Sequence, residues 1–149
     1  ELLLRGPMVT PGYWRNRQAT QKNLEGGWFH TGDLVRQDED QYIYVVDRIK
    51  NMFISGGENV YPAEIERVIV THPVVAEASV IAMPDEKWGE TGCAFVVLHP
   101  GEQLNETALM EYCSTQLARF KIPKSVVFIP ALPKNDTGKI NRLALREKV

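Results

Sequence analysis

Residues 61–70, Tyr-Pro-Ala-Glu-Ile-Glu-Arg-Val-Ile-Val, begin the part of the chain that decides the fold. Pro62 suits the first position of a helix, and the acidic residues Glu64 and Glu66 favour its positively polarised N-terminal end. An apolar stripe at helical spacing follows, formed by Ile65, Val68 and Ile69. The sequence therefore predicts a helix here, which ends before a His-Pro pair.

Further elements alternate with this helix along the chain. A strand-like start at Phe53 precedes the helix, and three longer strands are predicted over residues 74–83, 94–98 and 126–129. A second helix is predicted after Asn105, whose side chain suits an N-cap, and its apolar spacing continues to Phe120. The order strand, helix, strand, strand, helix, strand predicts a small α+β domain with a three-stranded sheet and flanking helices.

The first part of the chain follows a different pattern. Short strands are predicted over residues 2–4, 34–36 and 42–46, and a short helix within residues 15–24. Polar residues interrupt the apolar rhythm around Arg48 to Asn51. We therefore expect a β-rich first segment at 1–49 and a separate domain at 50–149.

Composition narrows the classes of function. The net charge of −2 argues against a general nucleic-acid or anionic-membrane surface, and no apolar run approaches the roughly 20 residues of a membrane span. The two cysteines and three histidines lack metal-ligand spacing, so no metal site is expected. Unpaired cysteines favour a reducing, cytoplasmic environment. Because the chain opens at Glu1 without a signal segment, we expect it to belong to a longer polypeptide.

Two short motifs in the first segment could carry nucleotide chemistry. In Thr31-Gly32-Asp33, the carboxylate could accept hydrogen bonds from both hydroxyls of a ribose, although a strand-entry turn alone would explain the motif. Arg48 carries a planar fork of donors that could bridge ribose and phosphate oxygens. Considered alone, Arg48 is better explained by an ordinary surface ion pair.

The third motif is Leu-Pro-Lys-Asn-Asp-Thr-Gly-Lys-Ile-Asn-Arg at residues 132–142. Its proline, asparagine and glycine residues are typical of a loop. Lys139 follows the glycine and has a long flexible stem, so it could neutralise charge on a carboxylate and an α-phosphate as they react. A solvated surface lysine is the alternative interpretation.

Two further sequences are typical of loops near a ligand. Ser-Gly-Gly-Glu-Asn at 55–59 contains paired glycines, which let a narrow ligand pass close to the backbone, but it matches neither a Walker loop nor a dinucleotide fingerprint. A tight turn before the helix would also explain it. Trp88 lies between two predicted strands, where a partly buried tryptophan is the simpler interpretation.

Taken together, these motifs resemble the acyl-adenylate-forming enzymes, which include acyl-CoA synthetases, adenylation domains of peptide synthetases and beetle luciferases. The resemblance covers essentially the whole chain. It rests on residues 1–14, Trp-Phe-His-Thr-Gly-Asp-Leu at 28–34, Asp-Arg-Ile-Lys at 47–50, the glycine loop with its helix at 54–66, and the tail at 133–142. The resemblance implies a short β-rich end of a large N-terminal domain, followed by a small C-terminal lid domain.

The resemblance also implies roles for single residues. Asp33 would bind the ribose hydroxyls of ATP or AMP, Arg48 would contact the nucleotide, and Lys50 would be the pivot of the hinge. Lys139 would serve the adenylation step. The residues implied to bind CoA are Gly57 and Trp88 along the pantetheine arm and Phe120 and Lys121 near the adenine. Ile122 departs from relatives that carry arginine there, which leaves the contacts to the nucleotide end of CoA open.

The implied reaction has two halves. A carboxylic acid reacts with ATP to give acyl-AMP and pyrophosphate, and the thiol of CoA then takes the acyl group, with a rotation of the lid between the halves. The phosphate loop, the acyl pocket and the Mg²⁺-binding glutamate motif of the family lie upstream of this chain. We therefore expect the chain alone to be inactive and to need the N-terminal domain of the same polypeptide.

The acceptor and the acid remain open at this level. The Ser-Gly-Gly-Glu-Asn-Val-Tyr-Pro run at 55–62 resembles CoA-forming ligases of fatty or aryl acids. A module that serves a carrier protein is one alternative. A non-catalytic module that binds CoA or a nucleotide is another.

Overall fold

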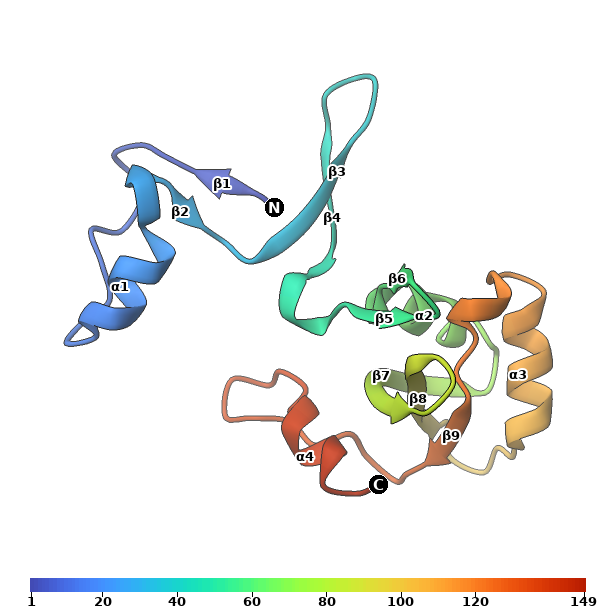
Figure 1. Cartoon of the computed structure of the whole chain (residues 1–149). Coiled ribbons are helices and arrows are strands. Elements are labelled where there is room, and N and C mark those ends of the chain that lie inside the picture. The colour runs from blue at the N-terminus through green and yellow to red at the C-terminus, as the bar shows by residue number, and fades with distance from the viewer. The chain divides into compact units, whose positions relative to one another are not determined.

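The structure, a computed structural model, describes all residues from 1 to 149. Contacts between Cα atoms divide the chain into two compact units, Glu1–Lys50 and Asn51–Val149, which we call unit 1 and unit 2. In Figure 1, unit 1 runs from blue to cyan and unit 2 from green to red.

Unit 1 consists of two small antiparallel pairs and short helices. Strand β1 (Leu3–Leu4) pairs with β2 (Phe29–His30), and β3 (Asp33–Gln37) pairs with β4 (Ile43–Arg48). Along the sequence, helix α1 (Arg17–Asn23) and the 3₁₀ turn η1 (Glu25–Gly27) connect β1 to β2. The turn η2 (Ile49–Asn51) follows β4. The predicted strands and short helix are present, and β2 was not predicted.

Unit 2 contains three helices whose starts follow the capping pattern of the sequence. These are α2 (Pro62–Ile69), α3 (Glu106–Ser114) and α4 (Arg142–Arg146). The side chain of Asn105 accepts a hydrogen bond from the N–H of Ala108 at 2.8 Å, which confirms the predicted cap of α3. Asn141 caps α4 in the same way, through the N–H of Ala144 at 3.2 Å.

The predicted continuation of the second helix to Phe120 is wrong. Helix α3 ends at Ser114, and Phe120 lies in the separate 3₁₀ turn η3 (Arg119–Lys121). The hydroxyls of Ser114 and Thr115 donate to the carbonyls of Glu111 and Tyr112 at 2.7 and 2.8 Å. Such local side-chain bonds compete with the helical ladder, so the helix stops although the apolar spacing continues.

The sheet of unit 2 has five strands, two more than predicted. They are β5 (Phe53–Ser55), β6 (Glu58–Val60), β7 (Val75–Asp85), β8 (Gly89–Leu98) and β9 (Ser125–Phe128). The order is β6-β5-β8-β7, and β9 pairs in parallel with β8. Strands β5 and β6 have three residues each and form a hairpin around Gly56-Gly57. A strand-like start at Phe53 was predicted, but its place in the sheet was not, and β6 was not predicted because so short a run gives no readable period.

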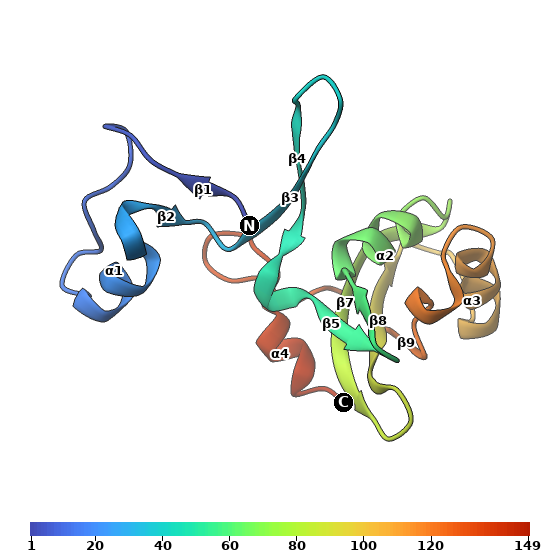
Figure 2. The same ribbon diagram turned by 45° about the horizontal axis from the view of Figure 1, so that its top comes forward.

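Alternation along β7 and β8 builds two separate apolar layers. On one face, Val80 and Val96 pack with residues of α2 and α3, among them Ile65 and Leu109. On the other face, Phe95 packs with the buried side chains of Leu132 and Leu145. Figure 2 shows the result, with α4 on one side of the sheet and α2 and α3 on the other. The chain contains no helix long and apolar enough to cross a membrane.

Candidate functional site

Asp33 and Arg48 are direct cross-strand partners at one end of the β3–β4 pair. The Nε of Arg48 lies 2.6 Å from Oδ1 of Asp33. The side chain of Arg48 is 52% exposed and that of Asp33 is 23% exposed, so water or a ligand can reach both. The backbone N–H of Arg48 donates to Oδ1 of Asp47 at 2.6 Å, which steadies the strand end.

This ion pair borders an open cleft within unit 1. The cleft is lined by residues of α1, of β2 and the connection that follows it, and of β4 and η2, which include Lys22, His30, Thr31, Gly32, Arg48 and Lys50. Gly32 has a φ of +72°, and a Cβ built there would meet no atom within 4 Å, so the backbone is open to an approaching ligand. Asp33 can accept hydrogen bonds from hydroxyls while Arg48 donates to anionic oxygens.

The lining of the cleft includes a second charged pair, formed by Glu1 and His30. Nδ1 of His30 lies 3.0 Å from Oε2 of Glu1, and the N–H of Gly32 donates to Oε1 of Glu1 at 3.0 Å. The hydrogen bond from His30, followed by that from Gly32, holds the pKa of the Glu1 carboxyl below its usual value. The sequence reasoning did not single out this pair, because its members are 29 residues apart.

Lys50 lies in η2, directly after β4, and its side chain is exposed. The N–H of the preceding residue, Ile49, donates to the carbonyl of Gly32 at 2.9 Å, so η2 begins from an anchored position. Lys50 is the last residue of unit 1. Its role as a hinge pivot stays a prediction.

Lys139 lies in a closed loop before α4, directly before the residue that closes the loop and opposite Asn135. The loop closes through a bridge between Lys134 and Ile140 and through the N–H of Asn141, which donates to the carbonyl of Pro133 at 2.8 Å. Inside the loop, Oδ1 of Asn135 accepts from the N–H of Lys139 at 2.9 Å and from both the N–H and the hydroxyl of Thr137. One amide side chain therefore organises the whole turn.

Asn135 is a positioning residue that the sequence reasoning missed. An asparagine side chain often bonds the backbone two residues further on in a turn, so the Asn-Asp-Thr-Gly sequence at 135–138 carried the signal. The side chain of Lys139 is exposed, and its ammonium makes no ion pair. A mobile cation on an ordered loop can be carried into a reaction centre without first breaking a bond.

Gly56 and Trp88 lie against each other at the hairpin of β5 and β6. The N–H of Gly56 donates to the carbonyl of Trp88 at 2.9 Å, and a Cβ built on Gly56 would lie only 2.7 Å from Cε3 of the Trp88 ring. The next residue, Gly57, has open space where its Cβ would be. Trp88 is 46% exposed, so the loop presents an aromatic face beside a bare backbone.

Phe120 and Lys121 lie in η3, which packs next to β6. Phe120 is 39% exposed. The ammonium of Lys121 is already paired with the carboxylate of Glu64 on α2, at 2.7 Å from Oε1 and 2.8 Å from Oε2. The four residues implied to bind CoA therefore gather around the β5–β6 hairpin, although Lys121 is held by a partner.

The structure separates this group from Lys139. The residues that frame the Lys139 loop, Leu132 and Ile140, pack in the apolar layer on the α4 face of the sheet. Residues around the β5–β6 hairpin, such as Phe53 and Val60, pack in the layer that contains α2 and α3. Unit 2 thus carries two candidate surfaces on different elements.

No group of three or more histidine, cysteine, aspartate or glutamate side chains is arranged to hold a metal ion. The two thiols, Cys93 and Cys113, are buried in the two apolar layers of the sheet. Burial raises the pKa of both thiols, which keeps them in the neutral form.

Comparison with known proteins identifies the family. Residues 64–139, just over half of the chain, match the model of the AMP-binding enzyme C-terminal domain. The long-chain-fatty-acid–CoA ligase FadD13 of Mycobacterium tuberculosis is 49% identical over 148 residues, which are 99% of this chain and 29% of that protein. The 2-succinylbenzoate–CoA ligase of Bacillus cereus is 44% identical over 149 residues, all of this chain and 30% of that protein.

Solved structures show the same relationship. The o-succinylbenzoate CoA synthetase (MenE) of Bacillus subtilis, in complex with its acyl-adenylate intermediate, matches with a TM-score of 0.90 and 40% identity. The match covers 97% of this chain and 29% of that one, so the chain spans less than a third of the length of these relatives. On the match over residues 64–139 and the shared fold, this chain belongs to the family of AMP-binding enzyme C-terminal domains.

Proposed function

We propose that this chain is the C-terminal part of an ATP-dependent acyl-CoA synthetase, which activates a carboxylic acid as acyl-AMP and transfers the acyl group to CoA. The observation that carries this proposal is the exposed, unpaired Lys139 on a loop that Asn135 orders. The two named relatives, both CoA ligases, support the same reaction class.

In this proposal, residues 1–49 are the end of a large N-terminal adenylation domain and residues 50–149 are its lid. The fit to the nucleotide is good, because Asp33 and Arg48 offer an acceptor and donors side by side. The fit to Mg²⁺ is poor, because no cluster of metal ligands exists here. We therefore assign the metal site, the phosphate loop and the acyl pocket to the N-terminal domain.

The adenylation step gives Lys139 its role. An oxygen of the carboxylic acid attacks the α-phosphorus of ATP, and the bond to pyrophosphate breaks. Negative charge accumulates where two anions meet, so a positioned ammonium lowers the barrier. Lys139 supplies that charge and is not consumed.

The thioester step uses the other surface of unit 2. The thiol sulfur of CoA attacks the acyl carbon and gives up its proton to solvent, the bond from the acyl carbon to the phosphate oxygen breaks, and AMP leaves. Gly57 offers open backbone and Trp88 an exposed aromatic face, which suits the narrow pantetheine arm. Phe120 would lie near the CoA adenine, and Lys121 could turn to it only by leaving Glu64.

A fatty acid is the acid class that we propose, because the 49%-identical relative is named as a long-chain-fatty-acid ligase. The 2-succinylbenzoate ligase is 44% identical, so an aryl acid is the second candidate. The N-terminal domain would decide between them, since the acyl pocket lies there.

The test is Lys139→Ala in the complete ligase that contains this chain. The rate of acyl-AMP formation, measured as pyrophosphate release, should fall by about 100-fold or more. This is the usual effect of removing one electrostatic contact to the transition state. Thioester formation from supplied acyl-AMP should stay within about threefold of the parent, because the ammonium acts only in the first half-reaction. Equal loss of both half-reactions would refute the role.

Lys148→Ala is the matched control, since Lys148 is also an exposed lysine of unit 2 without an ion pair. It should change neither half-reaction. The 149-residue chain alone should release no pyrophosphate from ATP and acid. Submicromolar binding of AMP or CoA to the isolated chain, measured by calorimetry, would instead favour a stand-alone binding module.

A further inference from the structure

Glu66 is a meeting point of three elements of unit 2. Its Oε1 accepts from the backbone N–H of Val80 on β7 at 2.8 Å and from the hydroxyl of Ser79 at 3.3 Å. The same oxygen lies 2.7 Å from Nη2 of Arg142, the first residue of α4. Glu66 itself is on α2, so one carboxylate joins α2, β7 and α4.

Glu66 satisfies a backbone N–H group at the edge of the sheet. Strand β7 is an edge strand of the sheet, so its outward N–H groups need a partner other than a strand. Glu66 supplies that partner at Val80. Arg142 then continues the connection to the opposite face, where α4 packs. The two side chains therefore link the two layers across the edge of the sheet.

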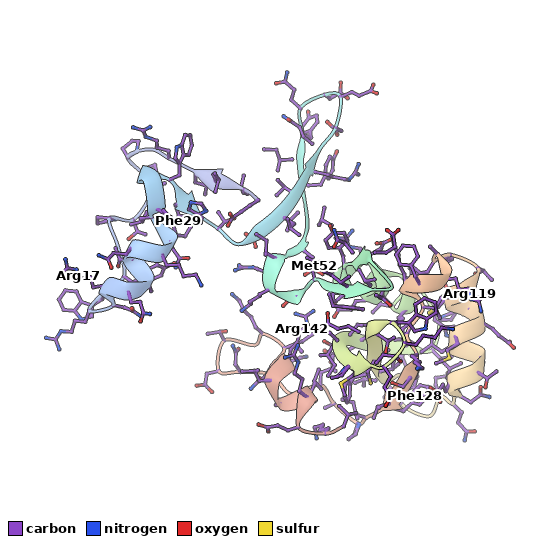
Figure 3. The ribbon with its side chains drawn as sticks, viewed as in Figure 1. Arg17, Phe29, Met52, Arg119, Phe128 and Arg142 are labelled. Atoms are coloured by element: carbon purple, nitrogen blue, oxygen red, sulfur yellow. The ribbon has the colours of Figure 1, made fainter.

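Arg142 also ends the loop that carries Lys139, only three residues away. Asn141, between them, is bonded back to Pro133 and caps α4. A shift of Arg142 would therefore move the cap and the closing bond of the loop together. Figure 3 labels Arg142 at the start of α4.

The other arm of the loop has a weaker anchor. Lys134 lies 2.7 Å from Glu77, but the two side chains are 44% and 41% exposed. The Arg142–Glu66 pair has the same separation with 31% and 17% exposure. Because exposed pairs are screened and gain little, the Arg142–Glu66 pair should dominate the placement of the loop.

We infer that Arg142 and Glu66 are positioning residues for adenylation, which hold the Lys139 loop at a fixed place on unit 2. The inference rests on the proposed function of Lys139. It assigns to Glu66 and Arg142 a part in one half-reaction, although neither has to touch a substrate.

The experiment compares half-reactions in the complete ligase. The main variant is the double substitution Glu66→Gln with Arg142→Gln, which removes the pair without leaving one charge half-buried and unpaired. Its acyl-AMP formation should fall about 10- to 100-fold, because small misplacements of a catalytic group cost that much. Thioester formation from supplied acyl-AMP should stay within about threefold, and so should the KM for CoA.

Two further variants keep the test decisive. Lys134→Gln removes the exposed anchor of the same loop and should leave both half-reactions within about threefold of the parent. Arg142→Lys keeps the charge with fewer donors, so it should rescue adenylation in part relative to Arg142→Gln. Melting temperatures of all variants show whether unit 2 remains folded.

The outcomes separate the inference from the proposed function. If Lys139→Ala leaves adenylation intact, the proposed function fails. If Lys139→Ala abolishes adenylation but the folded double variant does not reduce it, only the inference fails. Parallel loss of both half-reactions in the double variant, or an equal effect of Lys134→Gln, would also overturn the inference.

Discussion

Gly56 and Gly57 are neighbours with similar backbone angles and different surroundings. Their φ values are +59° and +89°, a region that side chains with a Cβ rarely adopt. A Cβ on Gly56 would meet the ring of Trp88 at 2.7 Å, whereas one on Gly57 would meet nothing within 4 Å. The two positions therefore separate backbone strain from contact with Trp88.

Gly56→Ala should displace Trp88, and Gly57→Ala should not. Both substitutions carry the strain of a positive φ, roughly 1 kcal/mol or more in each. Only Gly56→Ala should shift the fluorescence of Trp88, measured in a background where Trp14 and Trp28 are phenylalanine. Equal spectra for the two variants would show that the ring does not depend on the bare Gly56.

The residues of the candidate site differ in how far the sequence could predict their contacts. Asp33 and Arg48 pair because they end the two strands of a hairpin, and a hairpin register follows from the turn between them. Lys121 and Glu64 are 57 residues apart in sequence, so their contact depends on how α2 and η3 pack. The sequence therefore shows which residue types are available, but it does not predict the pairing of Lys121 with Glu64.

The turn between β7 and β8 is an element held by one carboxylate. Asp85 pairs with the ammonium of Lys124, and its Oδ1 accepts from the N–H groups of Lys87 and Trp88 at 2.9 and 3.0 Å. The hydrogen bond from Lys124, then that from the Trp88 N–H, lowers the pKa of the Asp85 carboxyl. Asp85 therefore orients the loop that carries Trp88.

The stability that Asp85 contributes should depend on pH and be lost in acid. Because its pKa is lower in the folded chain, the contribution is complete above the unfolded value of about 3.9 and is lost as the pH falls through the folded value. The melting temperature of the parent should therefore be higher than that of Asp85→Asn near neutral pH, and the two should converge as the pH falls below about 4. A constant difference down to acid pH would contradict this role.

Helix α4 offers a matched pair of leucines. Leu145 is fully buried against the sheet, whereas Leu143 on the same helix is 73% exposed. Leu145→Ala should lower the free energy of unfolding by about 2–5 kcal/mol, because it leaves a cavity in the apolar layer. Urea denaturation measures this loss.

Leu143→Ala is the control and should change the free energy of unfolding by less than about 0.5 kcal/mol. If the two variants lost similar stability, α4 would not be held through its buried face. Only the packing shows which leucine of this helix is inside.

Across the whole molecule, the apolar core is unevenly distributed. Every buried hydrophobic side chain lies in unit 2, from Phe53 to Leu145, and the one buried residue of unit 1 is Asp47. The exposed apolar side chains of unit 1 include Trp14, Tyr42, Ile43 and Val45. Unit 1 thus has little of its own to oppose the entropy of the unfolded chain.

A fragment of residues 51–149 should therefore keep the cooperative unfolding of the whole chain. Its urea midpoint should equal that of the 149-residue chain, and its free energy of unfolding in water should agree within about 10–15%, the usual error of the linear extrapolation. A fragment of residues 1–50 should show no cooperative transition, because it lacks an apolar core. A large fall of the midpoint in the 51–149 fragment would contradict this division.

The sequence by itself determined the α+β class, the helix starts at Pro62 and after Asn105, and the motifs that contain Asp33, Arg48 and Lys139. These features depend on the local conformational preferences of residues and on apolar spacing over a few residues, both of which are visible in the sequence. Only the tertiary structure decided that a β5–β6 hairpin joins the sheet, that Lys121 is held by Glu64, and that Arg142 reaches Glu66 across the β7 edge. Those contacts join residues far apart in sequence, and their formation depends on packing of the whole unit rather than on any local pattern.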